Sequence, residues 1–78
     1  MSWNYRVVEA TAFDGTKTYA IHEVYYEEGV ITSMTERPAS IQWVDYDHEE
    51  YGGAWVLQKM QRALTEPVLT RSDVGEKK

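Results

Sequence analysis

The stretch KTYAIHEVYY (residues 17–26) decides the fold of this chain, because its side chains alternate between two sides. One side carries Tyr19, Ile21, Glu23 and Tyr25, and the other carries Thr18, Ala20, His22, Val24 and Tyr26. Aromatic and β-branched residues with a period of two are typical of a β-strand. A zinc-protease helix needs a second histidine four residues after the first, and Tyr26 stands there instead. The pattern therefore predicts a strand and not a metal-binding helix.

Turn signals flank this strand on both sides. FDGT (residues 13–16) precedes it and contains Asp-Gly, which favours a hairpin because glycine tolerates positive φ. EEG (residues 27–29) follows it and turns the chain again. WNYRVVEA (residues 3–10) and VITSMTE (residues 30–36) alternate with the same period. We therefore expect an antiparallel meander of three strands, with Val30, Thr32 and Met34 opposite Ile31, Ser33 and Thr35 in the third.

The segment after Pro38 allows two interpretations. In ASIQWVDYD (residues 39–47), Ile41 and Trp43 alternate, which permits a short fourth strand. An extended loop laid on a helix fits the segment equally well.

One helix is predicted near the C-terminus from a stripe of residues at i, i+3, i+4 and i+7. The stripe consists of Gly53, Val56, Leu57, Met60, Ala63 and Leu64. Asp45 or Asp47 can cap the helix, and Pro67 prevents it from continuing beyond about Thr65 or Glu66. Gly52 and Gly53 leave two alternatives: the helix begins only near Ala54, or the glycines let its backbone approach the sheet closely.

These elements predict an α+β domain over residues 1–69, with one helix packed on one face of the three- or four-stranded meander. Residues 70–78 are expected to form a flexible polar tail. The chain has 78 residues and no cysteine, so no disulfide supports its small core. A domain of this size buries only about 60% of the surface that its unfolded chain exposes. A partner surface would add burial.

A single helix can cover only one face of the sheet, although both faces carry large aromatic rings. The side with Trp3, Tyr5, Val7, Tyr19, Ile21 and Tyr25 is the more apolar, so we assign it to the helix. The side left for a partner is then the one with Arg6, Val8, His22 and Tyr26, rimmed by Glu23 and Glu27. The sequence also allows the reverse, in which Tyr5, Tyr19 and Tyr25 face the partner. Trp55 lies on the flank of the helix beside Lys59 and Arg62, where it either contacts a partner or covers Trp3 or Trp43. The predicted binding residues are His22, Tyr26, Glu23, Glu27 and Trp55.

The sequence predicts no catalytic residues, cofactor or metal site. Its serines lie in no nucleophile turn, and the chain has no glycine-rich phosphate loop. His48 lies among Asp45, Asp47, Glu49 and Glu50, which is more typical of the acidic start of a helix than of a metal site. His22 is expected to be a partly buried strand residue bonded to a neighbouring polar group.

Charge argues against direct nucleic-acid binding. Residues 1–50 hold ten acidic and three basic side chains, a formal charge of −7, within a net charge of −5 for the whole chain. Binding to a phosphate backbone depends on lysine and arginine instead. We also expect no membrane segment and no secretory signal, and hence a cytoplasmic protein.

The sequence resembles a family of short bacterial proteins of unknown function. The resemblance rests on WNYRVV (residues 3–8), IHEVYY (residues 21–26), TERP (residues 35–38) and PVL (residues 67–69). It implies no activity. The order of strands and helix is also similar to that of HicB-type antitoxin domains, although no motif residues carry this second similarity.

Two functions follow as hypotheses. The first is a non-enzymatic module that binds another protein, or a second copy of itself as a homodimer, through an aromatic and acidic face of the sheet. The second is an antitoxin-like or inhibitory module whose acidic surface neutralises a basic partner.

Overall fold

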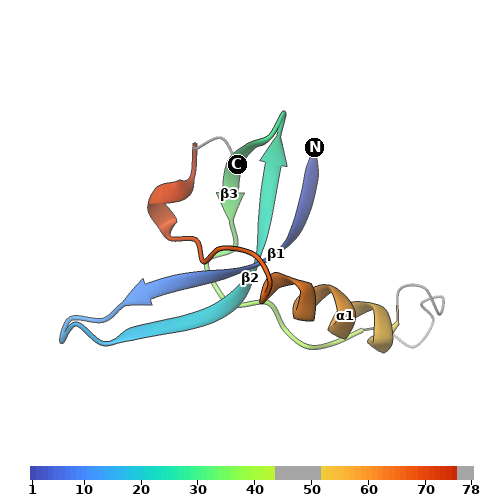
Figure 1. Cartoon of the computed structure of the whole chain (residues 1–78), viewed down its shortest axis with the longest axis horizontal. Helices are drawn as coiled ribbons and strands as arrows, with labels where there is room; N and C mark the ends of the chain where they lie inside the picture. The colour runs from blue at the N-terminus through green and yellow to red at the C-terminus, as the bar shows by residue number, and fades with distance from the viewer. Residues whose placement is uncertain (44–51, 76–78) are drawn as a thin grey trace.

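The computed structural model describes residues 1–43 and 52–75. In these residues three strands, β1 (Ser2–Thr11), β2 (Lys17–Glu27) and β3 (Val30–Met34), form one antiparallel sheet in the order β1-β2-β3. Helix α1 (Gly53–Ala63) and the short 3-10 helix η2 (Arg71–Asp73) follow (Figure 1). The predicted α+β meander with one helix near the C-terminus is confirmed.

The hairpin of β1 and β2 places on one face the side chains that the sequence predicts to share it. Trp3 pairs with Tyr25 and Val7 with Ile21, so odd-numbered residues of both strands share one face. Gly15 has φ +89° in the connecting turn, and the backbone N–H of Thr16 donates to Asp14 Oδ1 at 2.9 Å. Figure 1 shows both strands bending near their middle, so that the hairpin tip projects away from the rest of the chain.

A β-bulge changes the expected alternation of β3. Tyr25 pairs with Ser33, but the next residue, Tyr26, pairs with Ile31, so Thr32 is skipped. Ile31 and Met34 consequently lie on the same face as Val24, and both are buried. The prediction that Ile31 and Met34 face opposite sides is wrong, because a bulge shifts the period of two by one residue.

Helix α1 starts at Gly53 and ends at Ala63, before Pro67 as predicted. Its N-cap is Gly52, which makes no side-chain cap hydrogen bond, and the expected caps Asp45 and Asp47 lie outside the described residues. A Cβ on Gly53 would stand 2.7 Å from Cζ2 of Trp43, so any other residue there would have to displace this ring from the helix start. Residues 39–43 form no strand, and Trp43 lies on the helix as in the loop interpretation.

The helix packs mainly on β1, through Val56, Met60 and Ala63. It lies on the face that carries Trp3, Tyr5 and Val7, here named the helix face, which agrees with the sequence assignment. Two residues of the predicted stripe, Leu57 and Leu64, are instead 49% and 68% exposed. The buried stripe is narrower than expected because the helix rests on one edge strand and not across the whole sheet.

Residues 69–75 cross the opposite face of the sheet, here named the tail face. At the β1 edge, Leu69 donates its N–H to Val7 O, and Glu9 donates its N–H to Leu69 O. At the β3 edge, Gly75 donates its N–H to Ile31 O. The main hydrophobic cluster lies between these anchors and consists of Val8, Val24, Ile31, Met34 and Leu69.

Residues 70–75, which the sequence predicts to belong to a flexible tail, therefore contact the tail face of the sheet. Thr70 and Asp73 form a capping box around η2, with the Thr70 N–H donating to Asp73 Oδ2 at 2.8 Å. Arg71 Nη2 donates to Glu36 O at 2.9 Å, which fixes the segment beside the end of β3. Residues 76–78 lie outside the described residues.

Candidate functional site

The surface expected around His22 and Tyr26 is not an open one. His22 is 6% exposed, and its Nδ1 lies 2.9 Å from Thr35 O, so the ring is bonded to a neighbouring polar group as expected. Tyr26 is half-buried, and its hydroxyl donates to Asn4 Oδ1 at 2.9 Å. The tail face was assigned to a partner because a second covering layer was not expected there. Residues 69–75 supply that layer.

The remaining predicted binding residues are spread over the molecule. Glu23 lies on the helix face, where its Oε1 accepts a hydrogen bond of 2.8 Å from the Tyr25 hydroxyl. This bond raises the pKa of Tyr25 above its ordinary value of 10.0, because the neutral phenol is the donor that the carboxylate stabilises. Glu27 is exposed at the turn before β3, and Trp55 lies on the helix. The structure does not bring these five residues together on one surface.

Arg6 holds the tail face closed. This side chain is 7% exposed, and its Nη1 donates to the Tyr26 hydroxyl at 3.1 Å while its Nη2 donates to Pro67 O at 2.8 Å. Its Nε atom is buried and has no partner in the described part of the chain. Arg6 therefore links β1 to β2 and to the start of the C-terminal segment, and its role is structural.

The open aromatic surface lies on the helix face, at the junction of β1 and α1. The ring of Trp3 contacts Tyr5 edge-on, with centroids 5.2 Å apart, and meets the ring of Trp55 at 6.5 Å and 69°. Trp3 remains 44% exposed. Edge-to-face contacts of this kind each stabilise by about 0.5–1.5 kcal/mol beyond the burial of area. Of the five predicted binding residues, Trp55 is the one that belongs to this surface.

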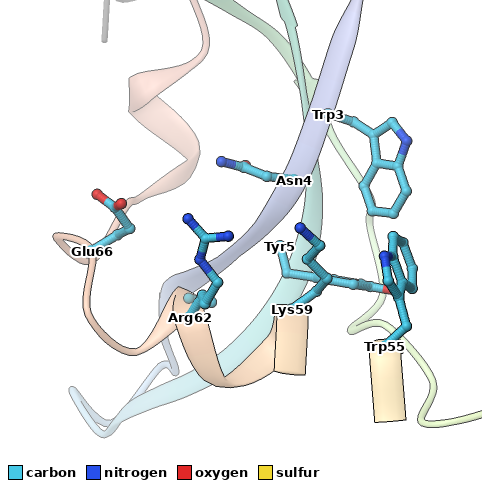
Figure 2. A pocket seen from close by; sticks show the side chains of 8 residues that line it. Trp3, Asn4, Tyr5, Trp55, Lys59, Arg62 and Glu66 are labelled. Carbon is cyan, nitrogen blue, oxygen red and sulfur yellow. The ribbon is translucent and has the colours of Figure 1, made fainter. Parts of the chain in front are cut away.

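These rings line a cleft of about 320 Å³ between the strand and the helix. Figure 2 shows Lys59 and Arg62 rising from α1 toward β1, with Trp3 and Trp55 on one side and Glu66 on the other. The lining residues are Trp3, Asn4, Tyr5, Trp55, Lys59, Arg62, Ala63 and Glu66. The cleft thus combines an aromatic end, two cations and one carboxylate.

Two positively charged side chains and one carboxylate line the cleft. Lys59 Nζ lies 5.8 Å from the centroid of the Trp55 ring, within range of a cation–π interaction. Neither Lys59 nor Arg62 forms an ion pair with another of the described residues. Partial burial, and then the nearby charge of Glu23, raises the pKa of Tyr5, so its hydroxyl stays neutral and able to donate. The cleft is locally basic, although the chain is acidic.

Sequence reasoning placed Trp55, Lys59 and Arg62 together on one helix flank, but it did not place that flank beside Trp3 and Tyr5. The spacing of three to four residues places Trp55, Lys59 and Arg62 on the same side of a helix. The position of this flank beside Trp3 and Tyr5 depends on which strand the helix crosses, and the sequence carries no local signal for that.

Other chemistry can be addressed only in part. The described residues contain no group of three or more His, Cys, Asp or Glu side chains that could hold a metal ion. The acidic cluster around His48 lies outside the described residues. Among the helices of residues 1–43 and 52–75, none is long and apolar enough to cross a membrane.

The resemblance to the short bacterial family and the similarity in arrangement to HicB-type domains stay predictions. No protein-family model, curated protein or solved structure matches this chain.

Proposed function

We propose that this chain is a non-enzymatic protein-binding module whose contact surface is the cleft between β1 and α1. The observation that carries the proposal is the exposed aromatic group at its mouth. Trp3 is 44% exposed although it touches Tyr5 and Trp55, which are half-buried, so the three rings form one continuous and partly exposed patch. Contiguous aromatic patches on small proteins usually mark interaction sites.

The composition of the cleft supports a protein partner. Tryptophan, tyrosine and arginine are the residues enriched in the energetically dominant parts of protein interfaces, and Trp3, Tyr5, Trp55 and Arg62 meet here. Asn4 and Lys59 add polar groups that orient a partner. The site is therefore moved from the tail face, where the sequence suggested it, to the helix face.

The other possibilities from the sequence, self-association and an antitoxin-like module, have less support from the geometry. Self-association remains an outcome of the test below. An antitoxin-like module would act through acidic residues, whereas the cleft presents Lys59 and Arg62. That alternative rests only on the acidic first part of the sequence.

Selection from a displayed library of random twelve-residue peptides tests the proposal. We expect enrichment on the wild-type chain and its loss on Trp3→Ser, because serine removes the ring at the mouth of the cleft. Leu64→Ser is the matched control, since Leu64 is 68% exposed and does not line the cleft. Circular dichroism must show that both variants fold. Equal enrichment on Trp3→Ser and on wild type would refute the assignment of the cleft.

Sedimentation velocity at two protein concentrations tests self-association. A dimer that forms in wild type and is lost in Trp3→Ser would identify a second copy as the partner at this surface. A dimer that persists in Trp3→Ser would place self-association elsewhere on the chain.

A further inference from the structure

The backbone beside the cleft is an open sheet edge. Val7 and Glu9 direct their C=O and N–H to the outer edge of β1, where they bond to Leu69. In an antiparallel strand every second residue points its backbone to the same edge, so Trp3 and Tyr5 do so too. No backbone hydrogen bond from the described residues reaches Trp3 or Tyr5 at this edge. The pairing that Leu69 begins on β1 is left incomplete toward the N-terminus.

The cations of the cleft stand above this open edge. Lys59 and Arg62 are one helical turn apart on α1 and both line the cleft that Trp3, Asn4 and Tyr5 bound from the strand (Figure 2). Neither has an anionic partner among the described residues. A strand lying on the β1 edge would place alternate side chains toward α1, within reach of these two groups.

We propose that the cleft binds an extended peptide segment that adds a strand to the free edge of β1 at Trp3 and Tyr5 and places one acidic side chain between Lys59 and Arg62. This inference rests on the proposed function and names its partner. Main-chain hydrogen bonds to a sheet edge supply affinity, and pockets for alternate side chains supply specificity. Apolar side chains beside the acidic one contact the rings of Trp3 and Trp55.

Two features of the cleft define the partner more closely. Glu66 lines the cleft next to Arg62, so a second acidic group on the peptide would meet a like charge. The segment therefore carries a single carboxylate among apolar residues and not an acidic run. A second copy joined edge to edge would bring its own Lys59 and Arg62 to this edge, where like charges repel. Charge complementarity thus favours a separate acidic segment over a second copy.

Reversing the charges of Lys59 and Arg62 tests whether they bind the acidic side chain of the peptide. The readout is the same peptide selection. On wild type we expect enriched peptides that alternate apolar residues with one Asp or Glu. On Lys59→Glu with Arg62→Glu we expect the acidic residue to be replaced by Lys or Arg. Lys17→Glu, far from the cleft in the hairpin, is the control and should leave the acidic preference unchanged.

Backbone methylation tests the added strand. A selected peptide is synthesised with N-methyl groups on every second residue, in the two possible phases. One phase removes the N–H groups that face β1 and should weaken binding at least tenfold, as followed by tryptophan fluorescence. The other phase faces solvent and should change the dissociation constant less than threefold. Equal effects of the two phases would overturn the strand geometry.

The outcomes separate this inference from the proposed function. Peptides that need Trp3 but show no acidic preference, or no response to the charge reversal, would overturn the inference and leave the cleft as a binding surface. Failure to enrich any peptide above the Trp3→Ser background would overturn both. Binding that needs Trp3 and a free carboxylate but tolerates methylation in both phases would identify a small acidic ligand in place of a strand.

Discussion

The two faces of the sheet are covered in different ways. The tail face is closed by residues 69–75, and the aliphatic side chains beneath it are almost fully buried, with Val24 and Ile31 at 0% exposure. The helix face is covered by α1 only along β1, and Trp3 at its rim stays 44% exposed. Helix α1 has the more regular structure, yet it leaves more of the helix face exposed than residues 69–75 leave of the tail face.

The difference teaches that anchoring matters more than regular structure in covering a small sheet. The C-terminal segment has only one short 3-10 helix, yet its backbone bonds to both outer strands, through Leu69 at β1 and Gly75 at β3. Helix α1 satisfies its own backbone bonds and meets the sheet only through side chains. It therefore covers the width of its apolar stripe and no more.

The largest effect is expected from Leu69→Ala, which removes the center of the tail-face cover. Leu69 is 2% exposed and belongs to the main cluster, so truncation should lower the free energy of unfolding by about 3 kcal/mol. Urea denaturation measures the change. Val68→Ala is the control, because Val68 is 48% exposed, and it should cost well under half as much. Equal costs would show that residues 69–75 do not cover the tail face.

A smaller loss is expected from Asp73→Ala. This change removes the carboxylate that accepts the Thr70 N–H in the capping box, which should cost about 1 kcal/mol. Denaturant midpoints compared with those of Ser72→Ala, which loses only the exposed contact with the Thr70 hydroxyl, isolate the cap. If Asp73→Ala proved no more destabilising than Ser72→Ala, the anchoring account of the tail face would fail.

On the helix face, the coupling between Trp3 and Trp55 should be smaller again. A double-mutant cycle with Trp3→Ala and Trp55→Ala should give a coupling of roughly 0.5–1 kcal/mol, the range of edge-to-face aromatic pairs. The cycle is read from thermal or denaturant unfolding of the four proteins. A coupling near zero would mean that the helix and the start of β1 are not in contact.

The smallest expected effect is a change in the pKa values of two tyrosines on the helix face. Because Glu23 raises the pKa of Tyr25 by hydrogen bonding and that of Tyr5 by its charge, Glu23→Gln should let both phenols ionise at lower pH. Ultraviolet absorbance of the phenolates follows this change. A pKa above the unfolded value of 10.0 stabilises the fold below that pH, and this stabilisation disappears as pH rises through the raised pKa. Tyr19→Phe is the control that removes a different phenol.

The local patterns of the chain were readable from the sequence, and the long-range contacts were not. The period of two in residues 17–26 and the Asp-Gly turn before them predicted the hairpin, and Pro67 limited the helix. The bulge at Thr32 could not be predicted, because one residue skipped in the strand pairing does not change the amino-acid composition of the strand. The cover that residues 70–75 form over the tail face was not predicted, because Arg71 and Gly75 reach it through bonds to Glu36 and Ile31, far away in the sequence.

The candidate site followed the same division. Trp55 was predicted as a binding residue from its place on the helix flank, and it lines the cleft. His22 and Tyr26 were chosen because their face was thought to lack a cover. The tail face is covered instead, because residues 69–75 bond to both outer strands.

The bridge between Val8 and Leu69 also sets an order of events during folding. The β1–β2 hairpin joins strands that are adjacent in the sequence and can begin to pair early, whereas the main cluster cannot close before Leu69 has arrived. On a ribosome, the chain must therefore wait with Val8, Val24 and Ile31 unprotected until residue 69 has left the exit tunnel. A chain truncated before Leu69 should therefore be prone to aggregation, and extension through Gly75 should rescue it.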